Sequence, residues 1–226
     1  LPGTGFIEMA IAASAIAFKT TANLTFKNVA FENALILSEE VTRTVQTVLT
    51  PNALTSNRLT AKEIPTEPVG YHFKIYSLNI QESSFASHPS ASNWISHASG
   101  EIISDTGSDT DSVDLATLQA SLPHELSPSV LYQRFQQQGM NYGPSFRCIS
   151  HLWHSHDAAL CQIEIDETLV SSFKDYHLHP VILDACLQGL EAISSADALL
   201  GATYVPIGLE RLQVTAQVCQ KAKRAR

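Results

Sequence analysis

The sequence is short of basic charge and has no cysteine spacing typical of a zinc site or a disulfide framework. Lysine and arginine number 14 against 22 aspartates and glutamates, a formal net charge of −8, which argues against nucleic acid or an anionic membrane surface as the main partner. The four cysteines, Cys148, Cys161, Cys186 and Cys219, are scattered and include no Cys-x-x-Cys pair. We therefore expect free thiols in a reducing, cytoplasmic compartment.

A hydrophobic run long enough to cross a membrane is also missing. The longest apolar run, from Phe6 to Phe18, is interrupted by Glu8 and Ser14 and is too short to span a bilayer, and no signal peptide is visible. Hydrophobic residues make up 44% of the chain and charged residues 16%, an ordinary globular composition. The 226 residues are enough for one large domain or two small ones. We expect no part of the chain to cross a membrane.

Two apolar helices are predicted, one in each half of the chain. Thr4 is a plausible N-cap for an Ala-rich run over Gly5–Ala17, which is apolar nearly all round and therefore predicts a buried helix. Pro180 suits the first turn of a second helix that reaches roughly residue 200. On this helix Asp184 and Gln188 are four residues apart and share one face. An acid among apolar neighbours is costly unless it is paired or used, although the helix dipole alone could stabilise it there.

The remaining pattern is mostly that of strands, and it occurs in two blocks. Alternating Val, Thr and Gln predict antiparallel sheet with one wet face. Between the blocks, residues 104–121 read as an acidic linker; a calcium loop through Asp105, Asp109 and Asp111 lacks the required residue order and the distal Glu. The order of strands, linker and strands, with an apolar helix in each block, is a weak internal repeat. The predicted strands lie within 24–49, 71–78, 94–103, 147–165, 204–207 and 209–214, and a further helix covers 128–138, ending at Gly139.

Four stretches, in this order along the chain, resemble motifs of the dehydratase domains of modular polyketide synthases. Leu1–Met9 is similar to the segment that follows the family's catalytic histidine, and Trp94–Gly100 matches its Trp-x-x-His-x-x-Gly strand. Tyr142–Phe146 matches Tyr-Gly-Pro-x-Phe, and His179–Gln188 matches His-Pro-x-x-Leu-Asp-x-x-x-Gln. The resemblance covers the whole chain and is far more specific than any one motif.

The resemblance implies an α+β double hot-dog fold, in which two antiparallel sheets each wrap a central helix. We expect an N-terminal half over 1–103, the linker over 104–121 and a C-terminal half over 122–226. Family members continue beyond both ends of this sequence, so we expect the chain to be truncated at its start and at its end.

The resemblance also implies the chemistry, which is dehydration of a β-hydroxyacyl thioester to the α,β-enoyl thioester during polyketide chain extension. Such a reaction needs an acid for the leaving hydroxyl, a base for the α proton and a backbone N–H for the carbonyl oxygen. By the family's motifs, Asp184 is the general acid and Gln188 orients it. By the same motifs, the residues that bind the substrate are Tyr142, Gly143, Pro144 and Pro2. His179 and Pro180 have a structural role near the site.

The base is the missing part of this assignment. The family motif His-x-x-x-Gly-x-x-x-x-Pro ends at Pro2, which places its histidine and glycine before residue 1. None of the nine histidines fits that motif. His97 is expected to be a structural histidine in a strand, and His179 to order the turn before Pro180. The chain as given is therefore expected to lack the base.

No cofactor of the protein's own is implied, because the thioester itself acidifies the α carbon. The substrate would be carried on the phosphopantetheine of an acyl carrier protein, with neighbouring synthase domains and a second copy of the chain, as a homodimer, as further partners. Two other classes of function stay open: a non-catalytic dehydratase-like module of the same synthase, and another hot-dog enzyme such as an enoyl isomerase or a thioesterase.

Three further patterns point weakly to other sites. His151, His154 and His156 are close in sequence, but no further carboxylate or cysteine stands at convincing ligand spacing, and we expect no metal there. Gly143–Arg147 is not a nucleophile elbow because Arg147 replaces the second glycine. Gly3-Thr-Gly5 lacks the preceding strand and the third glycine of a nucleotide loop.

Overall fold

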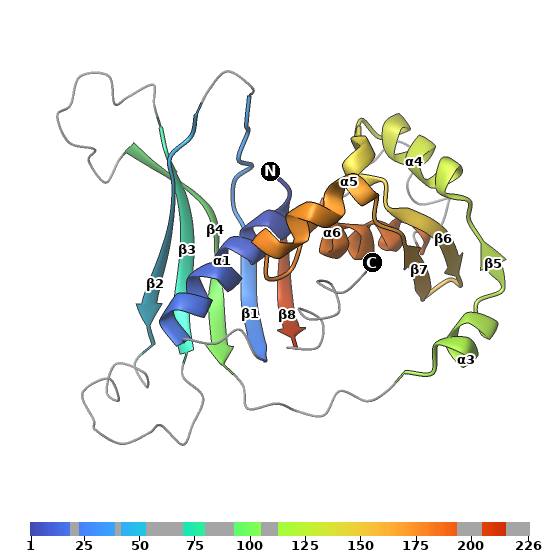
Figure 1. Ribbon diagram of the computed structural model, residues 1–226, viewed down its shortest axis with the longest axis horizontal. Helices are drawn as coiled ribbons and strands as arrows, with labels where there is room; N and C mark the ends of the chain where they lie inside the picture. The colour runs from blue at the N-terminus through green and yellow to red at the C-terminus, as the bar shows by residue number, and fades with distance from the viewer. Residues whose placement is uncertain are drawn as a thin grey trace. The chain divides into compact units, whose positions relative to one another are not determined.

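The computed structural model describes residues 1–18, 23–38, 42–52, 70–79, 93–104, 113–193 and 205–215. The chain divides into two compact units (Figure 1). The first consists of Leu1–Ser108 and Pro206–Ala222, the second of Asp109–Val205 and Lys223–Arg226. Every strand pair within the described ranges is antiparallel.

The first unit is a five-stranded sheet with helix α1 (Gly3–Phe18) packed against it (Figure 1). The strand order is β2-β3-β4-β1-β8, so the first strand in sequence lies next to the last. The strands are β1 (Leu24–Phe31), β2 (Val45–Pro51), β3 (Gly70–Leu78), β4 (Trp94–Ser104) and β8 (Gly208–Val214).

The core of this unit lies between α1 and the sheet. Ile7 and Ile11 of α1 are fully shielded from solvent, as are Phe26 of β1 and Phe73 of β3, whose rings meet edge to face at 6.0 Å. Burial of each such side chain stabilises the folded state by about 1.5–3 kcal/mol. The apolar run predicted as a buried helix is therefore the helix against which the sheet packs.

A bulge in β1 explains the glycine that ends the Trp94–Gly100 motif. The β1–β4 register shifts between Lys27 and Ala30, where Asn28 has a left-handed φ of 50°. Across from the bulge, a Cβ added to Gly100 would lie 2.8 Å from the Phe73 ring and 3.1 Å from the Cα of Val29. The absence of a side chain at residue 100 thus lets β4 pass the bulge and the buried ring.

Strand β8 corrects the expected division of the chain. Residues 122–226 were expected to form one C-terminal half, but Gly208–Val214 pairs with β1, with Leu24 opposite Val214 and Ala30 opposite Gly208. Its alternating pattern did predict a strand; the pattern carries no information about which edge the strand joins. The β1 edge is hydrogen-bonded by this distant segment instead of being left open.

The second unit contains a three-stranded sheet of order β5-β6-β7 with short helices around it. The strands are β5 (His124–Glu125), β6 (Ile149–His154) and β7 (Ala159–Ile163). The α-helices are α3 (Leu115–Ala120), α4 (Pro128–Gln137), α5 (Glu167–Val170) and α6 (Pro180–Gln188). The 3-10 helices are η3 (Pro144–Phe146), η4 (Ser171–Asp175) and η5 (Gly189–Ala192).

Helix α4 begins and ends as its sequence predicts. Ser127 caps its first turn by accepting a hydrogen bond from the Val130 N–H. At its end Gly139 has a φ of 85°, and the Met140 N–H donates to the Phe135 carbonyl. This is the Schellman arrangement that a C′ glycine permits. From this helix Leu131 and Phe135 enter a core that also contains Leu126, Cys148, Ile149, Leu152, Val181, Ala185 and Ala192.

Other local expectations need correction. The acidic linker predicted over 104–121 contains helix α3, which Asp114 caps through its carboxylate; Asp105, Asp109 and Asp111, the calcium-loop alternative, lie outside the described residues. Helix α6 ends at Gln188 and passes into η5, short of the predicted residue 200. The apolar stretch 35–37 is not a strand.

Candidate active site

His179 starts helix α6 and is fully used in doing so. Its Nδ1 accepts the Val181 N–H at 3.3 Å, and its Nε2 lies 3.2 Å from the Ser172 hydroxyl. The ring stacks on Phe173 at 4.4 Å. Because burial lowers the pKa of His179, the imidazole stays neutral, as an N-cap acceptor requires. Pro180 follows in the first turn, where its missing N–H costs nothing.

Asp184 and Gln188 lie one turn apart on the buried face of α6. Their exposed fractions are 9% and 3%, and the Gln188 Nε2 donates to the Asp184 Oδ2 at 2.8 Å. Burial raises the pKa of Asp184, and the hydrogen bond from Gln188 opposes that rise in part. This carboxyl therefore holds its proton to a higher pH than an exposed aspartate does, as a general acid needs.

Gln188 also joins two sequence motifs that are about forty residues apart. Its Nε2 donates to the Phe146 carbonyl at 3.0 Å, and Phe146 is the last residue of the Tyr142–Phe146 motif. Its Oε1 accepts the Tyr132 hydroxyl at 3.2 Å, and that hydroxyl in turn accepts the Ile149 N–H at 3.3 Å. The acid of one motif is thus attached to the backbone of the other through a single amide.

Tyr142 lies within electrostatic reach of the acid. Its ring meets Phe135 edge to face at 4.9 Å. Burial, with a smaller contribution from the Asp184 charge, raises the pKa of Tyr142 to about 12, so the phenol stays protonated and able to donate. Gly143 and Pro144 follow in the exposed η3 turn, and a Cβ added to Gly143 would meet nothing within 4 Å. Tyr142, Gly143, Asp184 and Gln188 therefore all belong to the second unit.

Pro2, the remaining predicted substrate residue, belongs to the first unit. Its carbonyl accepts the Gly5 N–H at 3.0 Å in the first turn of α1. The Thr4 hydroxyl, which was predicted as the N-cap of this helix, is buried and has no hydrogen-bond partner within the described part of the chain.

His97 is buried at the centre of the first unit. Its Nδ1 faces the Asn33 carbonyl at 2.9 Å and its Nε2 the Ser77 hydroxyl at 2.7 Å, while the ring stacks on Phe6 at 5.8 Å. Because a carbonyl only accepts, the Nδ1 carries the proton. Both ring nitrogens are occupied by these hydrogen bonds, so His97 has no free lone pair to take a proton from a substrate. Its contacts are those of a structural residue.

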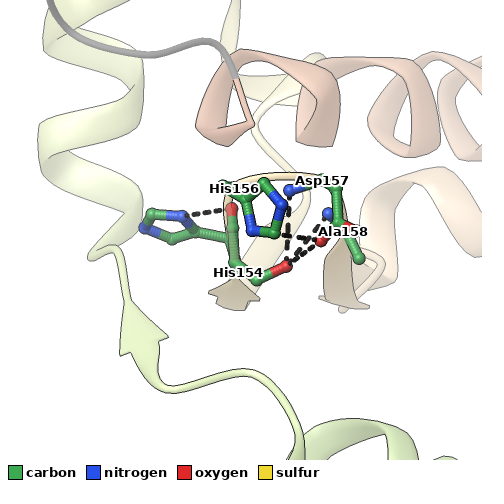
Figure 2. A network of polar contacts seen from close by, with 5 residues as sticks. His154, His156, Asp157 and Ala158 are labelled. Carbon is green, nitrogen blue, oxygen red and sulfur yellow. Dashed lines mark hydrogen bonds and ion pairs between the residues drawn. The ribbon is translucent and has the colours of Figure 1, made fainter.

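Of the three histidines considered as metal ligands, His154 and His156 lie at the hairpin turn between β6 and β7 (Figure 2), whereas the His151 ring stacks on Trp153 at 5.6 Å. The His154 Nδ1 lies 3.3 Å from the Ser155 carbonyl, and the His156 Nδ1 lies 3.6 Å from Asp157. The Ser155 hydroxyl donates to Asp157 and accepts the Ala158 N–H, closing the turn between β6 and β7. Across the described ranges, three or more His, Cys, Asp or Glu side chains nowhere gather in a geometry that could hold a metal ion.

Sequence reasoning missed Tyr132 and the Phe146 carbonyl. Tyr132 stands in a helix whose apolar spacing gives no sign of a polar role, and a backbone carbonyl carries no sequence signal at all. A Tyr-Gly-Pro-x-Phe motif beside an Asp-x-x-x-Gln motif does hint that the two meet, but the atoms that meet emerge only from the fold. Among the described residues, none of the helices has the length and apolar character needed to cross a membrane.

Two family models cover most of the chain. A model described as "Polyketide synthase dehydratase N-terminal domain" matches residues 110–226, and one described as "Polyketide synthase dehydratase domain" matches residues 1–63. Among curated proteins, the phthioceranic/hydroxyphthioceranic acid synthase of Mycobacterium tuberculosis is 26% identical over 155 residues, which are 67% of this chain and 6% of that protein. A highly reducing polyketide synthase of Cordyceps militaris is 31% identical over 134 residues, 55% of this chain and 5% of that protein. The chain therefore spans a small fraction of the curated relatives it matches.

Solved structures agree with these matches. The dehydratase domain from the CurF module of curacin polyketide synthase is 25% identical and superposes with a TM-score of 0.78, covering 97% of this chain and 70% of that one. An aspartate-to-asparagine mutant of the CurK dehydratase, described as inactive, is 27% identical with a TM-score of 0.76 and covers 94% and 68%.

Proposed function

Because this chain belongs to the polyketide synthase dehydratase family and has its α+β double hot-dog fold, we propose that it dehydrates a β-hydroxyacyl thioester to the α,β-enoyl thioester during polyketide chain extension. One observation carries the proposal for this chain's own residues. Asp184 is shielded from solvent, its pKa is raised by burial, and it is held by Gln188 on a helix of the second unit.

Asp184 acts as the general acid. Its carboxyl proton passes to the β-hydroxyl, the C–O bond breaks, and water leaves while a base takes the α proton and the C=C bond forms. Tyr142, with its pKa raised to about 12, keeps a phenol proton available for hydrogen bonding near the acid. Gly143, Pro144 and Pro2 keep the substrate-binding role that the family motifs they match imply.

The family motif that ends at Pro2 implies a histidine as the base, at a position before residue 1 that this sequence does not include. Within the chain, His97 and His179 do not suit the role of the base, because every ring nitrogen of the two is already engaged. The substrate arrives on the phosphopantetheine of an acyl carrier protein, and no further cofactor or metal takes part. Neighbouring synthase domains and a second copy of the chain are further partners, and the free thiols of Cys148, Cys161 and Cys186 favour the cytoplasm.

The test is Asp184→Asn in the natural full-length polypeptide. We expect conversion of a β-hydroxyacyl carrier thioester to the enoyl product to fall at least about a hundred-fold, because general acid catalysis is typically worth that much or more. The melting temperature should be unchanged or higher, since a desolvated carboxyl is replaced by a neutral amide.

Asp166→Asn is the matched control. Asp166 caps α5 from an exposed position, and asparagine caps equally well, so both activity and stability should stay at the native level. Unimpaired dehydration by Asp184→Asn would reject the acid assignment and favour a non-catalytic dehydratase-like module.

A further inference from the structure

We propose that Tyr132 is a positioning residue for Asp184: its hydroxyl locks the Gln188 amide with the nitrogen toward Asp184, which leaves the other carboxyl oxygen to carry the transferable proton. The effect of Tyr132 on catalysis rests on the proposed function. The hydrogen bonds between Tyr132, Gln188 and Asp184 do not depend on the reaction, so the effect of Tyr132 on Asp184 can be tested separately.

The direction of the Tyr132 hydrogen bond follows from its neighbours. The Ile149 N–H lies 3.3 Å from the Tyr132 oxygen and can only donate to it. The phenol hydrogen is therefore free for the Gln188 Oε1 at 3.2 Å. Burial raises the pKa of Tyr132, so the hydrogen stays on the phenol across the physiological range.

The Phe146 carbonyl identifies which end of the Gln188 amide is the nitrogen. The Phe146 carbonyl lies 3.0 Å from one end, and a carbonyl only accepts, so that end is the nitrogen. The two hydrogens of this nitrogen go to the Phe146 carbonyl and to the Asp184 Oδ2 at 2.8 Å. The oxygen end is left for Tyr132. All the hydrogen-bonding groups of the amide are thereby used in one consistent arrangement.

This arrangement decides which oxygen of Asp184 can act as the acid. Oδ2 accepts the Gln188 N–H, so a proton on the carboxyl resides on Oδ1. In a flipped amide, the Gln188 oxygen would face Oδ2. It would repel the carboxylate, and it would accept the acid's proton in a hydrogen bond that competes with the substrate hydroxyl. Tyr132 disfavours the flip together with the Phe146 carbonyl, because an N–H₂ group turned toward its hydroxyl would meet the hydrogen it donates.

The Tyr132 ring is held where this function requires it. It packs 6.4 Å from the Phe135 ring and 6.3 Å from the Tyr142 ring. The Arg147 guanidinium lies 5.6 Å above its centre, and the Nε of that arginine donates to the Tyr142 carbonyl at 2.9 Å. These contacts involve the ring and spare the hydroxyl. Tyr132→Phe therefore removes the hydrogen bonds of the hydroxyl to Gln188 and to the Ile149 N–H while keeping the packing of the ring.

The first measurement is the titration of Asp184 in the 226-residue chain, followed by carboxyl ¹³C NMR and identified by its loss in Asp184→Asn. Tyr132→Phe should raise the pKa of Asp184, because the amide then keeps only the Phe146 carbonyl to hold its nitrogen toward the carboxyl. In a Gln188→Met background, which has no amide to orient, the same substitution should leave the pKa unchanged. Tyr76→Phe, in the first unit, is the control for loss of a phenol hydroxyl.

The second measurement is dehydration by the natural polypeptide. Tyr132→Phe should lower kcat roughly five- to tenfold, the value of one hydrogen bond, with KM changed less than about twofold. The pH at which activity declines on the alkaline side should move upward with the Asp184 titration. If Tyr132→Phe does not fold, Gln188→Met alone should raise the Asp184 pKa by removing the same donor.

Each result bears on one proposal. An Asp184 titration that Tyr132→Phe leaves in place, or moves equally in the Gln188→Met background, overturns the positioning role. So does a shifted titration with an unchanged kcat. Full activity of Asp184→Asn, by contrast, rejects the proposed acid while the link between Tyr132 and Asp184 is still measured by NMR.

Discussion

At the scale of single residues, burial acts on two groups of α6 in opposite directions with the same result. It raises the pKa of Asp184 and lowers the pKa of His179, so for both side chains it favours the neutral form over the charged one. A neutral carboxyl can donate a proton, and a neutral imidazole can accept the N–H that begins the helix. The low polarity around α6 therefore favours both the capping of its first turn by His179 and the raised pKa of Asp184.

The pH dependence of stability should reveal the neutral state of His179. Its folded pKa is lowered, so the unfolded chain binds the proton more readily, and the contribution to stability is complete above pH about 6.5 and is lost as the pH falls toward the folded value. His179→Asn retains a capping oxygen without a titrating group. Its melting temperature should therefore decline less between pH 7 and pH 5 than that of the native chain.

The control for that experiment is His156→Asn, because the His156 side chain is 91% exposed. It should leave the slope of melting temperature against pH at the native value. Equal slopes for His179→Asn and the native protein would show that His179 is not held neutral by the fold. Thermal melts of the 226-residue chain at several pH values decide between the two.

The candidate site was predictable only in part at this scale. The four-residue spacing of Asp184 and Gln188 places both on one helix face, and their contact follows from that spacing and from burial. Tyr132 could not be found in the same way. Its hydroxyl reaches Gln188 across 56 residues of sequence, and such a contact is set by the packing of α4 on α6, not by any local pattern.

At the scale of elements, hydrophobic periodicity identified α1, α4, α6 and most of the strands, and it missed the short helices α3 and α5. The apolar runs of α1 and α6 predicted helices because burial drives both. Helix α3 was hidden in the acidic segment because none of its residues is buried; it is supported by the Asp114 cap and the Ser121 C-cap hydrogen bonds. The end of α6 was set too late because the apolar pattern continues while the backbone tightens into η5.

The bulge in β1 makes a prediction for its exposed residue Asn28. A left-handed φ of 50° suits glycine and asparagine and strains other residues by roughly 1–2 kcal/mol. Asn28→Gly should leave the free energy of unfolding nearly unchanged, whereas Asn28→Val should lower it by about that amount or more, since a branched Cβ tolerates the region least. Chemical denaturation of the three proteins measures both differences. Equal stability of the valine and glycine variants would mean that the strand does not keep the bulge.

At the scale of the whole molecule, the first unit is completed by a segment from the far end of the chain. Strand β8 pairs with β1 from Leu24 to Ala30, and Val214 is 2% exposed within the core. Sequence periodicity recognised this strand, but the expected division at the linker placed it in the C-terminal half, because a strand's partner depends on topology and not on its own pattern. The stability of the first unit therefore depends on a strand that lies about a hundred residues further along the chain than the other strands of the unit.

Two tryptophans allow the dependence of the first unit on β8 to be measured, because Trp94 lies in the first unit and Trp153 in the second. Each can therefore report on the unfolding of one unit.

A chain ending after Tyr204 lacks β8 and leaves the N–H and C=O groups of the β1 edge unpaired, whereas a chain ending after Thr215 keeps the strand. In a Trp153→Phe background, where Trp94 alone reports, the shorter chain should unfold at clearly lower denaturant concentration than the longer one. In a Trp94→Phe background, where Trp153 reports on the second unit, the two truncations should differ much less. A peptide of residues 205–215 added to the shorter chain should restore part of the Trp94 transition by pairing with β1. Coincident Trp94 transitions for the two truncations would show that the first unit is stable without its fifth strand.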